Sequence, residues 1–305
     1  MSKKEHIPYR IESLSELRRV LGLTKPLHPL VMIANNMEKD IDLSRMPNPH
    51  IKSFYKISFL KNISGKLKYG QRFYDFEEGG MVFIAPNQVI ENDGNQNDYA
   101  GYSLFFHPDF LLNTSLAIKI KNFGFFSYDV NETLHLSEKE KESIIAIFKV
   151  IEEELQLPID DFSQDIVVTQ IELLLHYCNR YYKRQFVTRK AVSNEILHIL
   201  ESHLENYFGN ENSLNSGIPT VQDLAEKVHL TPKYLSDMLR SLTGRNAQQL
   251  IHDKLIDKAK ELLTITNLSA SEIAYKLGFE YSQSFSRFFK AKTDLSPLEF
   301  RKSFN

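Results

Sequence analysis

The hydrophobic positions near the end of the chain form one pattern that occurs twice. In each copy, a short helical pattern is followed by a turn and then by a second helical pattern. Corresponding apolar residues lie 49 positions apart in the first helix and 50 apart in the second: Leu224 and Ile273, Val228 and Leu277, Leu235 and Phe285, Met238 and Phe288. Two short helices joined by a tight turn are typical of a helix-turn-helix, whose second helix can enter the major groove of DNA.

The polar face of each second helix is the candidate DNA contact. We expect ten residues to bind DNA: Lys233, Tyr234, Ser236, Asp237 and Arg240 in the first copy, and Ser282, Gln283, Ser284, Arg287 and Lys290 in the second. Among them, Arg240 and Lys290 suit phosphate groups. Arg287 suits guanine and Gln283 suits adenine, because these side chains can form bidentate hydrogen bonds with those bases. Asp237 stands where the second copy has Arg287 and can accept from cytosine, so the two copies should read different half-sites.

Capping residues mark the ends of these helices. Three N-terminal signals are present, each a hydroxyl residue followed by proline or, three places on, by an acid: Thr220 with Asp223, Thr231 with Pro232, and Ser269 with Glu272. Gly244 follows the second helix of the first copy, where a left-handed C-cap is expected. Asp294 holds the matching place in the second copy, where it adopts that conformation less readily than glycine.

Between positions 29 and 107 the pattern changes to short segments separated by turn residues. After a short helix at Leu14–Leu21, the segments predict five strands: Leu30–Ala34, Phe54–Leu60, Lys66–Phe76, Met81–Ala85 and Tyr99–Phe106. Several closely spaced strands favour a small barrel or sandwich. The strand aromatics, such as Phe54, Phe83 and Tyr102, fill its core or line a ligand pocket, since alternation places about half of them inside.

Three longer helical patterns follow the strands. The first begins at Ser137 and ends before Pro158, the second covers about Asp161–Arg184, and the third covers about Lys190–Phe208. The second carries a broad apolar stripe that must be buried somewhere: Ile166, Ile171, Leu174, Leu175 and Cys178. This stripe packs inside the chain, forms a dimer interface, or does both on different edges. The polar segment 209–217 is either a flexible tether or a loop within the C-terminal domain.

Charge is unevenly distributed along the chain. The 305 residues include 37 Lys and Arg against 39 Asp and Glu, a net charge of −2. From Pro219 onward there are 13 basic and 10 acidic residues, a net charge of +3, which leaves −5 for the rest. Because this basic excess is modest, DNA binding must depend on where the charges lie. The length and the 42% hydrophobic content indicate a globular protein of at least two domains.

Several kinds of chemistry have no support in the sequence. The ten histidines are scattered without a His-x-His pair, and neither a Gly-x-Ser-x-Gly elbow nor a phosphate-binding glycine loop is present. We therefore expect no enzyme activity, no metal and no cofactor. The single Cys178 provides no disulfide within the chain, and neither a signal region nor an apolar run long enough for a bilayer occurs. These features favour the cytoplasm and exclude a membrane-spanning role.

A family resemblance is carried by Ser271–Arg301, with the sequence SEIAYKLGFEYSQSFSRFFKAKTDLSPLEFR. This segment resembles the signature of the AraC/XylS family of transcription regulators. The upstream segment Lys254–Leu263, KLIDKAKELL, resembles the helix that links the two helix-turn-helix units in that family. The chain differs from the family pattern at Lys254, where Arg is usual, and at Asp294, where Gly is usual. Neither residue lies on a base-reading face.

The pattern and the resemblance together predict an α+β protein in three parts. Residues 1–130 are expected to form a sensing domain, and the resemblance implies a cupin-like β-barrel of jelly-roll type for it. Residues 131–188 are expected to form a helical dimerisation segment. Residues 189–305 are expected to form an all-α, AraC-type DNA-binding domain with helix-turn-helix units at about 220–242 and 270–292.

The expected function is sequence-specific transcription regulation by a homodimer bound to double-stranded promoter DNA. The resemblance implies activation in response to a small-molecule effector or partner, and a contact with RNA polymerase. Two other classes remain open: a cupin-type enzyme, and an effector-binding protein with a non-functional DNA-binding appendage. A bound metal would favour the enzyme, whereas salt-dependent binding to specific DNA would exclude the effector-binding protein.

Overall fold

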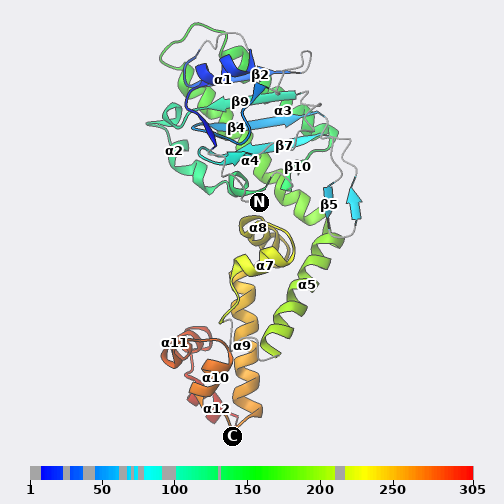
Figure 1. Cartoon of the computed structure of the whole chain (residues 1–305), viewed down its shortest axis with the longest axis vertical. Helices are drawn as coiled ribbons and strands as arrows, with labels where there is room; N and C mark the ends of the chain where they lie inside the picture. The colour runs from blue at the N-terminus through cyan, green and yellow to red at the C-terminus, as the bar shows by residue number, and fades with distance from the viewer. Residues whose placement is uncertain are drawn as a thin grey trace, which may run out of the picture. The chain divides into compact units, whose positions relative to one another are not determined.

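The protein consists of two compact units, Met1–Gln185 and Phe186–Asn305, called unit 1 and unit 2 below. A computed structural model describes residues 8–22, 28–36, 45–61, 67–69, 72–74, 79–90, 101–129, 132–209 and 217–304 (Figure 1). The segment 131–188, expected as a separate dimerisation part, lies almost entirely in unit 1. The expected boundary at 188 lies three residues after the last residue of unit 1.

Unit 1 is built on a five-stranded antiparallel sheet with the order β10-β7-β4-β9-β2. Its strands are β2 (Val31–Asn35), β4 (Tyr55–Leu60), β7 (Gly80–Ile84), β9 (Gly101–Phe106) and β10 (Leu134–His135). The central strands are rich in aromatic and β-branched residues, which fit a pleated surface that is covered on both sides. Gly101 begins β9 with φ 154°, and a Cβ there would lie 1.9 Å from the Phe59 carbonyl oxygen. Only glycine fits this close approach of β9 to β4.

The other described strands form two small sheets. One has the order β1-β3-β8, from Tyr9–Ile11, His50–Lys52 and Val89–Ile90, and the other pairs β5 (Leu67–Tyr69) with β6 (Arg72–Tyr74). In the described part of the chain no sheet closes on itself, because β2 and β10 are edge strands. The closed cupin-like barrel is therefore not confirmed. The strand expected at Lys66–Phe76 contains two short antiparallel strands instead.

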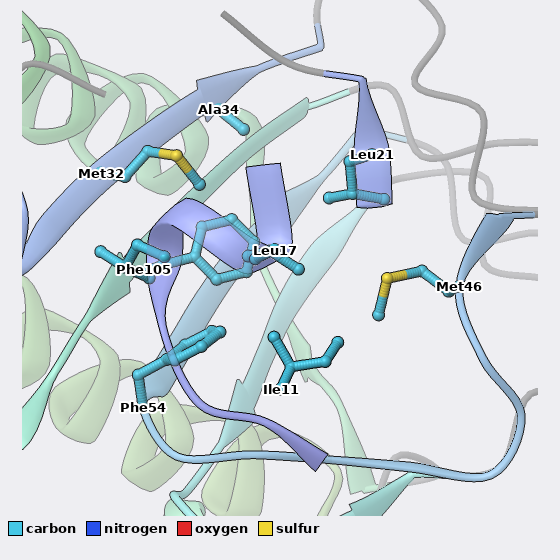
Figure 2. Packing of buried hydrophobic residues seen from close by; sticks show 9 residues of the cluster. Ile11, Leu17, Leu21, Met32, Ala34, Met46, Phe54 and Phe105 are labelled. Atoms are coloured by element: carbon cyan, nitrogen blue, oxygen red, sulfur yellow. The ribbon is translucent and has the colours of Figure 1, made fainter. Parts of the chain in front are cut away.

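One face of the five-stranded sheet is covered by α1 (Leu14–Leu21). The side chain of Ser13 accepts a hydrogen bond from the Glu16 N–H and starts this helix, and Gly22 ends it in the left-handed conformation. The cluster between helix and sheet is buried and apolar: Ile11, Leu14, Leu17, Leu21, Met32, Ala34, Met46, Phe54 and Phe105. Figure 2 shows these side chains, with all but Leu14 labelled. The helix predicted at Leu14–Leu21 is confirmed with those bounds.

The opposite face of the sheet packs on aromatic and helical residues from later in the chain. Here lie α3 (Glu138–Glu154) and α4 (Ser163–Thr188), preceded by the short helix α2 (Leu116–Lys119). Tyr102 of β9 stacks on Phe148 of α3 with ring centroids 5.4 Å apart. Phe83 of β7 lies 4.3 Å from Phe125 between ring centroids. These strand aromatics thus fill the core, which is the simpler of the two accounts expected for them.

The apolar stripe of α4 is largely buried within unit 1. Ile171, Leu174, Leu175 and Cys178, four of the five residues predicted for a dimer interface, are fully buried. They form part of the core because α4 turns this side toward the unit's own side chains. Burial also raises the pKa of the Cys178 thiol, which leaves it protonated and unreactive. The fifth residue, Ile166, is exposed.

The described residues of unit 2 form helices joined by loops, and no strand occurs among them. Its helices are α5 (Lys190–Gly209), α7 (Val221–Lys227), α8 (Pro232–Thr243), α9 (Ala247–Ile265), α10 (Ala270–Lys276), α11 (Ser282–Thr293) and α12 (Pro297–Lys302). The long helix α9 joins the two copies of the pattern and buries one apolar side, including Ile251, Leu255 and Leu262. Among the described helices of both units, none is both long and apolar enough to cross a membrane.

Candidate nucleic-acid interface

The duplicated pattern corresponds to a duplicated backbone geometry. In the first copy the Leu230 N–H donates to the Ala225 carbonyl at 3.0 Å, and in the second the Phe279 N–H donates to the Ala274 carbonyl at 2.9 Å. One residue before each donor, the chain adopts the left-handed conformation: His229 has φ 55° and Gly278 has φ 88°. Each turn reverses the chain in the same way, so α7 with α8 and α10 with α11 are two helix-turn-helix units.

The predicted caps hold these units together. Thr220, Thr231 and Ser269 each accept a hydrogen bond from a backbone N–H of the first helical turn. Gly244 and Asp294 end α8 and α11 in the left-handed conformation, as predicted. These capping predictions are confirmed, and the helix starts agree with the sequence signals.

The capping carboxylates are held in their charged form. The backbone N–H of Ser269 donates to Glu272, which lowers the pKa of that carboxyl, and Thr220 lowers the pKa of Asp223 in the same way. A lowered pKa stabilises the folded state above the usual carboxyl range, and this contribution is lost as pH falls through the lowered pKa. Both capping boxes are therefore intact near neutral pH.

The recognition helix α11 is anchored by two fully buried aromatic rings, Phe285 and Phe289. The centroid of Phe285 lies 5.4 Å from that of Phe279 in the preceding turn, and that of Phe289 lies 5.4 Å from that of Phe300 in α12. Because both anchors lie on one side, they fix the rotation of α11 about its axis. The opposite side of the helix consequently faces solvent.

That solvent side carries Gln283, Arg287 and Lys290, which we call the α11 stripe. The three residues follow the spacing i, i+4, i+7, which places them within about 60° of one another around a helix. All three side chains are exposed. Among the described residues, the side chains of Arg287 and Lys290 form no ion pair or hydrogen bond, although Glu299 lies near enough to Lys290 for their charges to interact. The α11 stripe thus presents two cations and one amide to a partner outside the chain.

Helix α8 carries the equivalent α8 stripe, Lys233, Asp237 and Arg240, exactly 50 positions earlier. Its electrostatics differ, because Lys233 Nζ lies 2.9 Å from Asp237 Oδ1 in an ion pair within the helix. Arg240 is exposed at the next turn. The first copy therefore offers one cation beside a neutral pair, whereas the second offers two cations.

The other predicted contacts differ in exposure. Ser284 is exposed, whereas Ser236 and Ser282 are half-buried beside the stripes. Tyr234 is only 4% exposed, and its ring lies edge-on to Phe186 with centroids 5.1 Å apart. Tyr234 lies on the interior side of α8, about 100° around the helix from Lys233, and belongs to the core of unit 2. It is a packing residue and not a surface available to DNA.

Two residues that the sequence prediction missed also shape this interface. Tyr281 occupies the N-cap of α11, is exposed, and makes no capping hydrogen bond with its side chain. In the sequence, Tyr281 could have been noticed as an aromatic residue at an N-cap position, where Ser, Thr, Asp or Asn is usual. Arg301 donates to the carbonyls of Leu263 and Leu268, at 3.0 and 2.6 Å, and so fastens α12 to the region where α9 ends.

Arg184, next to the last residue of unit 1, has a structural role. Arg184 donates to both carboxylate oxygens of Glu140, at 3.0 and 2.6 Å, and to the His135 carbonyl at 2.8 Å. The Arg184 side chain thus forms its hydrogen bonds within unit 1.

No cluster of His, Cys, Asp and Glu that could hold a metal ion occurs in the part of the chain that the structure describes.

Comparisons with known proteins agree with this geometry. A family model described as a helix-turn-helix domain matches residues 224–303. The transcriptional activator RhaS of Escherichia coli O1:K1 / APEC is 27% identical over 258 residues, covering 83% of this chain and 87% of RhaS. The raffinose operon transcriptional regulatory protein RafR of Pediococcus pentosaceus is 26% identical over 261 residues, covering 83% of this chain and 87% of RafR.

Solved structures similar to this chain include some that cover as little as 30% and as much as 85% of it. The C-terminal domain of the response regulator yesN from Fusobacterium nucleatum is 30% identical, with a TM-score of 0.30, and covers 34% of this chain and 95% of that domain. The duplicated helix-turn-helix, the signature at Ser271–Arg301 and the regulators aligned along most of the chain agree with one another. The protein is a DNA-binding transcription regulator whose C-terminal helix-turn-helix domain is of the AraC type.

Proposed function

We propose that the protein is a homodimer that reads promoter DNA with α8 and α11 and activates transcription in response to a small molecule sensed by unit 1. The observation that carries the DNA-reading part is the α11 stripe. Its Arg287 and Lys290 side chains are exposed and form no ion pair or hydrogen bond among the described residues, on a helix whose rotation is fixed by Phe285 and Phe289. Side chains arranged in this way can reach base edges and phosphates from the major groove.

Each side chain of the two stripes is assigned a contact. Arg287 donates to guanine, Gln283 bonds adenine, and Lys290 and Arg240 contact phosphates. Ser282 and Ser284, together with the N-terminal turn of α11 at Tyr281, lie where backbone phosphates pass a recognition helix. In the first copy, Asp237 accepts from cytosine while Lys233 shields it from the phosphates, and Ser236 lies at the edge of the contact.

Selection of bound sequences from random duplexes, with the purified full chain, tests this proposal. We expect an enriched site with two unlike half-sites, because the α8 and α11 stripes carry different side chains. Binding to that site should weaken steeply as salt is raised, since phosphate contacts release counterions. Absence of any enriched sequence at low salt would contradict sequence-specific reading.

The proposed dimer contact uses the exposed edge of α4. Ile166 and Leu173 are 41% and 42% exposed, and their spacing of seven residues places them on one side of α4; Phe162, one residue before the helix, is 69% exposed. Apolar residues aligned in this way favour a contact with a second copy of the helix. The proposed contact therefore keeps Ile166 from the residues predicted for the dimer interface and adds the exposed Phe162 and Leu173.

Replacing both Ile166 and Leu173 by glutamate should convert the dimer to a folded monomer, because the charges face solvent in the monomer and would be buried in the dimer. Light scattering measures the molar mass, and circular dichroism checks folding. The matched control is Ile171→Glu, which should unfold unit 1 because this side chain is buried in one chain. A double variant that remains a dimer would place the interface elsewhere.

Unit 1 is assigned the sensing role because the family resemblance implies a cupin-like domain there. The relative RhaS is named an activator and RafR is named for the raffinose operon, which supports activation in response to a small molecule. Bound at a promoter, the dimer would recruit RNA polymerase. We assign it to the cytoplasm, where bacterial promoter DNA is found, and assign it no enzyme activity because its relatives are transcription regulators.

A further inference from the structure

Unit 1 contains a group of basic side chains that the DNA-binding function does not use. His50 and Lys52 belong to β3, and Lys56 belongs to β4. Lys52 is only 5% exposed and His50 is buried, and Lys56 extends over the Phe105 ring at 5.9 Å from its centroid. Lysine is rarely buried unless an opposite charge pairs with it. This group therefore requires an explanation other than packing.

In the part of the chain that the structure describes, the hydrogen-bond partner of Lys52 is a neutral group and not a carboxylate. The His50 ring bonds the Pro47 carbonyl through Nδ1 at 2.8 Å, so this nitrogen carries the hydrogen. The other ring nitrogen, Nε2, lies 2.7 Å from Lys52 Nζ and accepts from it. Among the described residues no carboxylate bonds to Lys52 or Lys56, and an ammonium group has three hydrogens to donate.

The electrostatics agree with this lack of a carboxylate partner among the described residues. Burial is the main cause that lowers the pKa of Lys52, and the charge of Lys56 lowers it further. Burial lowers the pKa of Lys56 to about 8, and burial with the two lysines lowers the pKa of His50 to about 4. The three groups thus lie close enough to repel one another when charged. A bound anion would reverse each of these effects.

Neutral hydrogen-bonding groups lie on the same face of the sheet as Lys56. Ser58 and Ser103 are buried and share a hydrogen bond of 2.8 Å between their hydroxyl oxygens. Ser58 follows Lys56 by two residues in β4, and Ser103 pairs with Ser58 across the strands. One hydroxyl hydrogen of this pair stays free to donate, and together with the Lys56 ammonium it is a donor of the kind that holds a carboxylate or phosphate group.

We propose that Lys52 and Lys56 bind a small oxyanion, the carboxylate or phosphate group of an effector, with His50 positioning Lys52. This inference names the chemical class of the effector and so depends on the proposed function. Its test uses no DNA, and failure of anion binding therefore leaves the DNA-reading assignment untouched. If the protein binds the anion but no DNA, the proposed DNA reading is wrong and the anion site stands.

Thermal unfolding of the full chain with succinate or inorganic phosphate tests the site, with chloride at equal ionic strength and uncharged raffinose as controls. We expect one of the two oxyanions to raise the unfolding midpoint in a saturable manner, because a ligand that binds only the folded state stabilises it. A response to succinate alone assigns a carboxylate, and a response to phosphate alone assigns a phosphate group. No response beyond that of chloride, or a response to raffinose only, would overturn the proposal.

Lys52→Met separates a binding role from a structural one. Without an anion this variant should unfold at a midpoint raised by roughly 2–4 °C, because it removes a buried ammonium that no carboxylate of the described residues pairs with. It should also lose the response to the oxyanion, and Lys56→Met should weaken that response at least tenfold in concentration. The matched control is Lys119→Met, which breaks an exposed pair with Glu172 and should leave the response unchanged. An unchanged response in both Lys52→Met and Lys56→Met, or a lowered midpoint in both, would overturn the proposal.

Discussion

Arg287→Ala should lower the affinity for the selected DNA site by about tenfold to a hundredfold and leave the affinity for random duplexes nearly unchanged. The expected loss is that of one bidentate arginine–guanine contact, which contributes roughly 1–3 kcal/mol of discrimination. Arg287 suits this role because it is exposed on the α11 stripe, one helical turn after Gln283, and has no partner among the described residues. The measurement is binding of the full-length variant to both DNAs across a salt series.

Lys290→Ala is the matched control for that experiment. Lys290 lies in the last turn of the same stripe, where a side chain meets the DNA backbone, so its loss should weaken binding to both DNAs about equally. It should also reduce the slope of log affinity against log salt by about one. If Arg287→Ala weakens binding to both DNAs equally, Arg287 contacts phosphate, and base reading by this position is wrong.

The helix-turn-helix units were predictable because their signals are local. Each helix start depends on residues three places apart, such as Ser269 and Glu272, and each apolar stripe repeats within one or two turns. Because the unit occurs twice, the apolar and capping positions of one copy could be checked against those of the other. With the offset of 50 positions, Asp237 in α8 is the equivalent of Arg287 in α11, as the sequence indicated. Tyr234 was expected on the polar face of α8, but it lies on the same side of the helix as Met238 and is buried with it.

The architecture of unit 1 was less accessible because it depends on contacts between distant segments. Strands such as β8 and β10 have only two residues, too few for alternation to be recognised. The broad stripe of α4 was recognised as buried, but its sequence does not say whether the chain itself or a second copy covers it. Lys52 and Lys56 alternate with apolar neighbours in a way typical of a solvated strand face, and only the packing of β3 shows that Lys52 is buried.

The second large effect concerns the turn that sets the angle between α10 and α11. Gly278 has φ 88°, and a Cβ at this position would lie 2.5 Å from the carbonyl carbon of Gly217. The Tyr207 hydroxyl donates to the carbonyl oxygen of the same Gly217 at 2.8 Å. The turn of the second copy therefore packs backbone against backbone, on a segment that α5 also holds.

Gly278→Ala should destabilise unit 2 by about 3 kcal/mol, because a left-handed L-residue costs roughly 1–2 kcal/mol and the clash with Gly217 adds to it. His229→Ala is the matched control: it occupies the same place in the first copy, already with φ 55°, and is exposed. Because one L-residue there replaces another, it should change stability by less than about 1 kcal/mol. Urea unfolding of the full-length variants, followed by circular dichroism of the helices, measures both. Equal urea midpoints for Gly278→Ala and wild type would mean that the turn does not pack on Gly217, whereas a lowered midpoint with weaker DNA binding would show that this packing positions α11 for the groove.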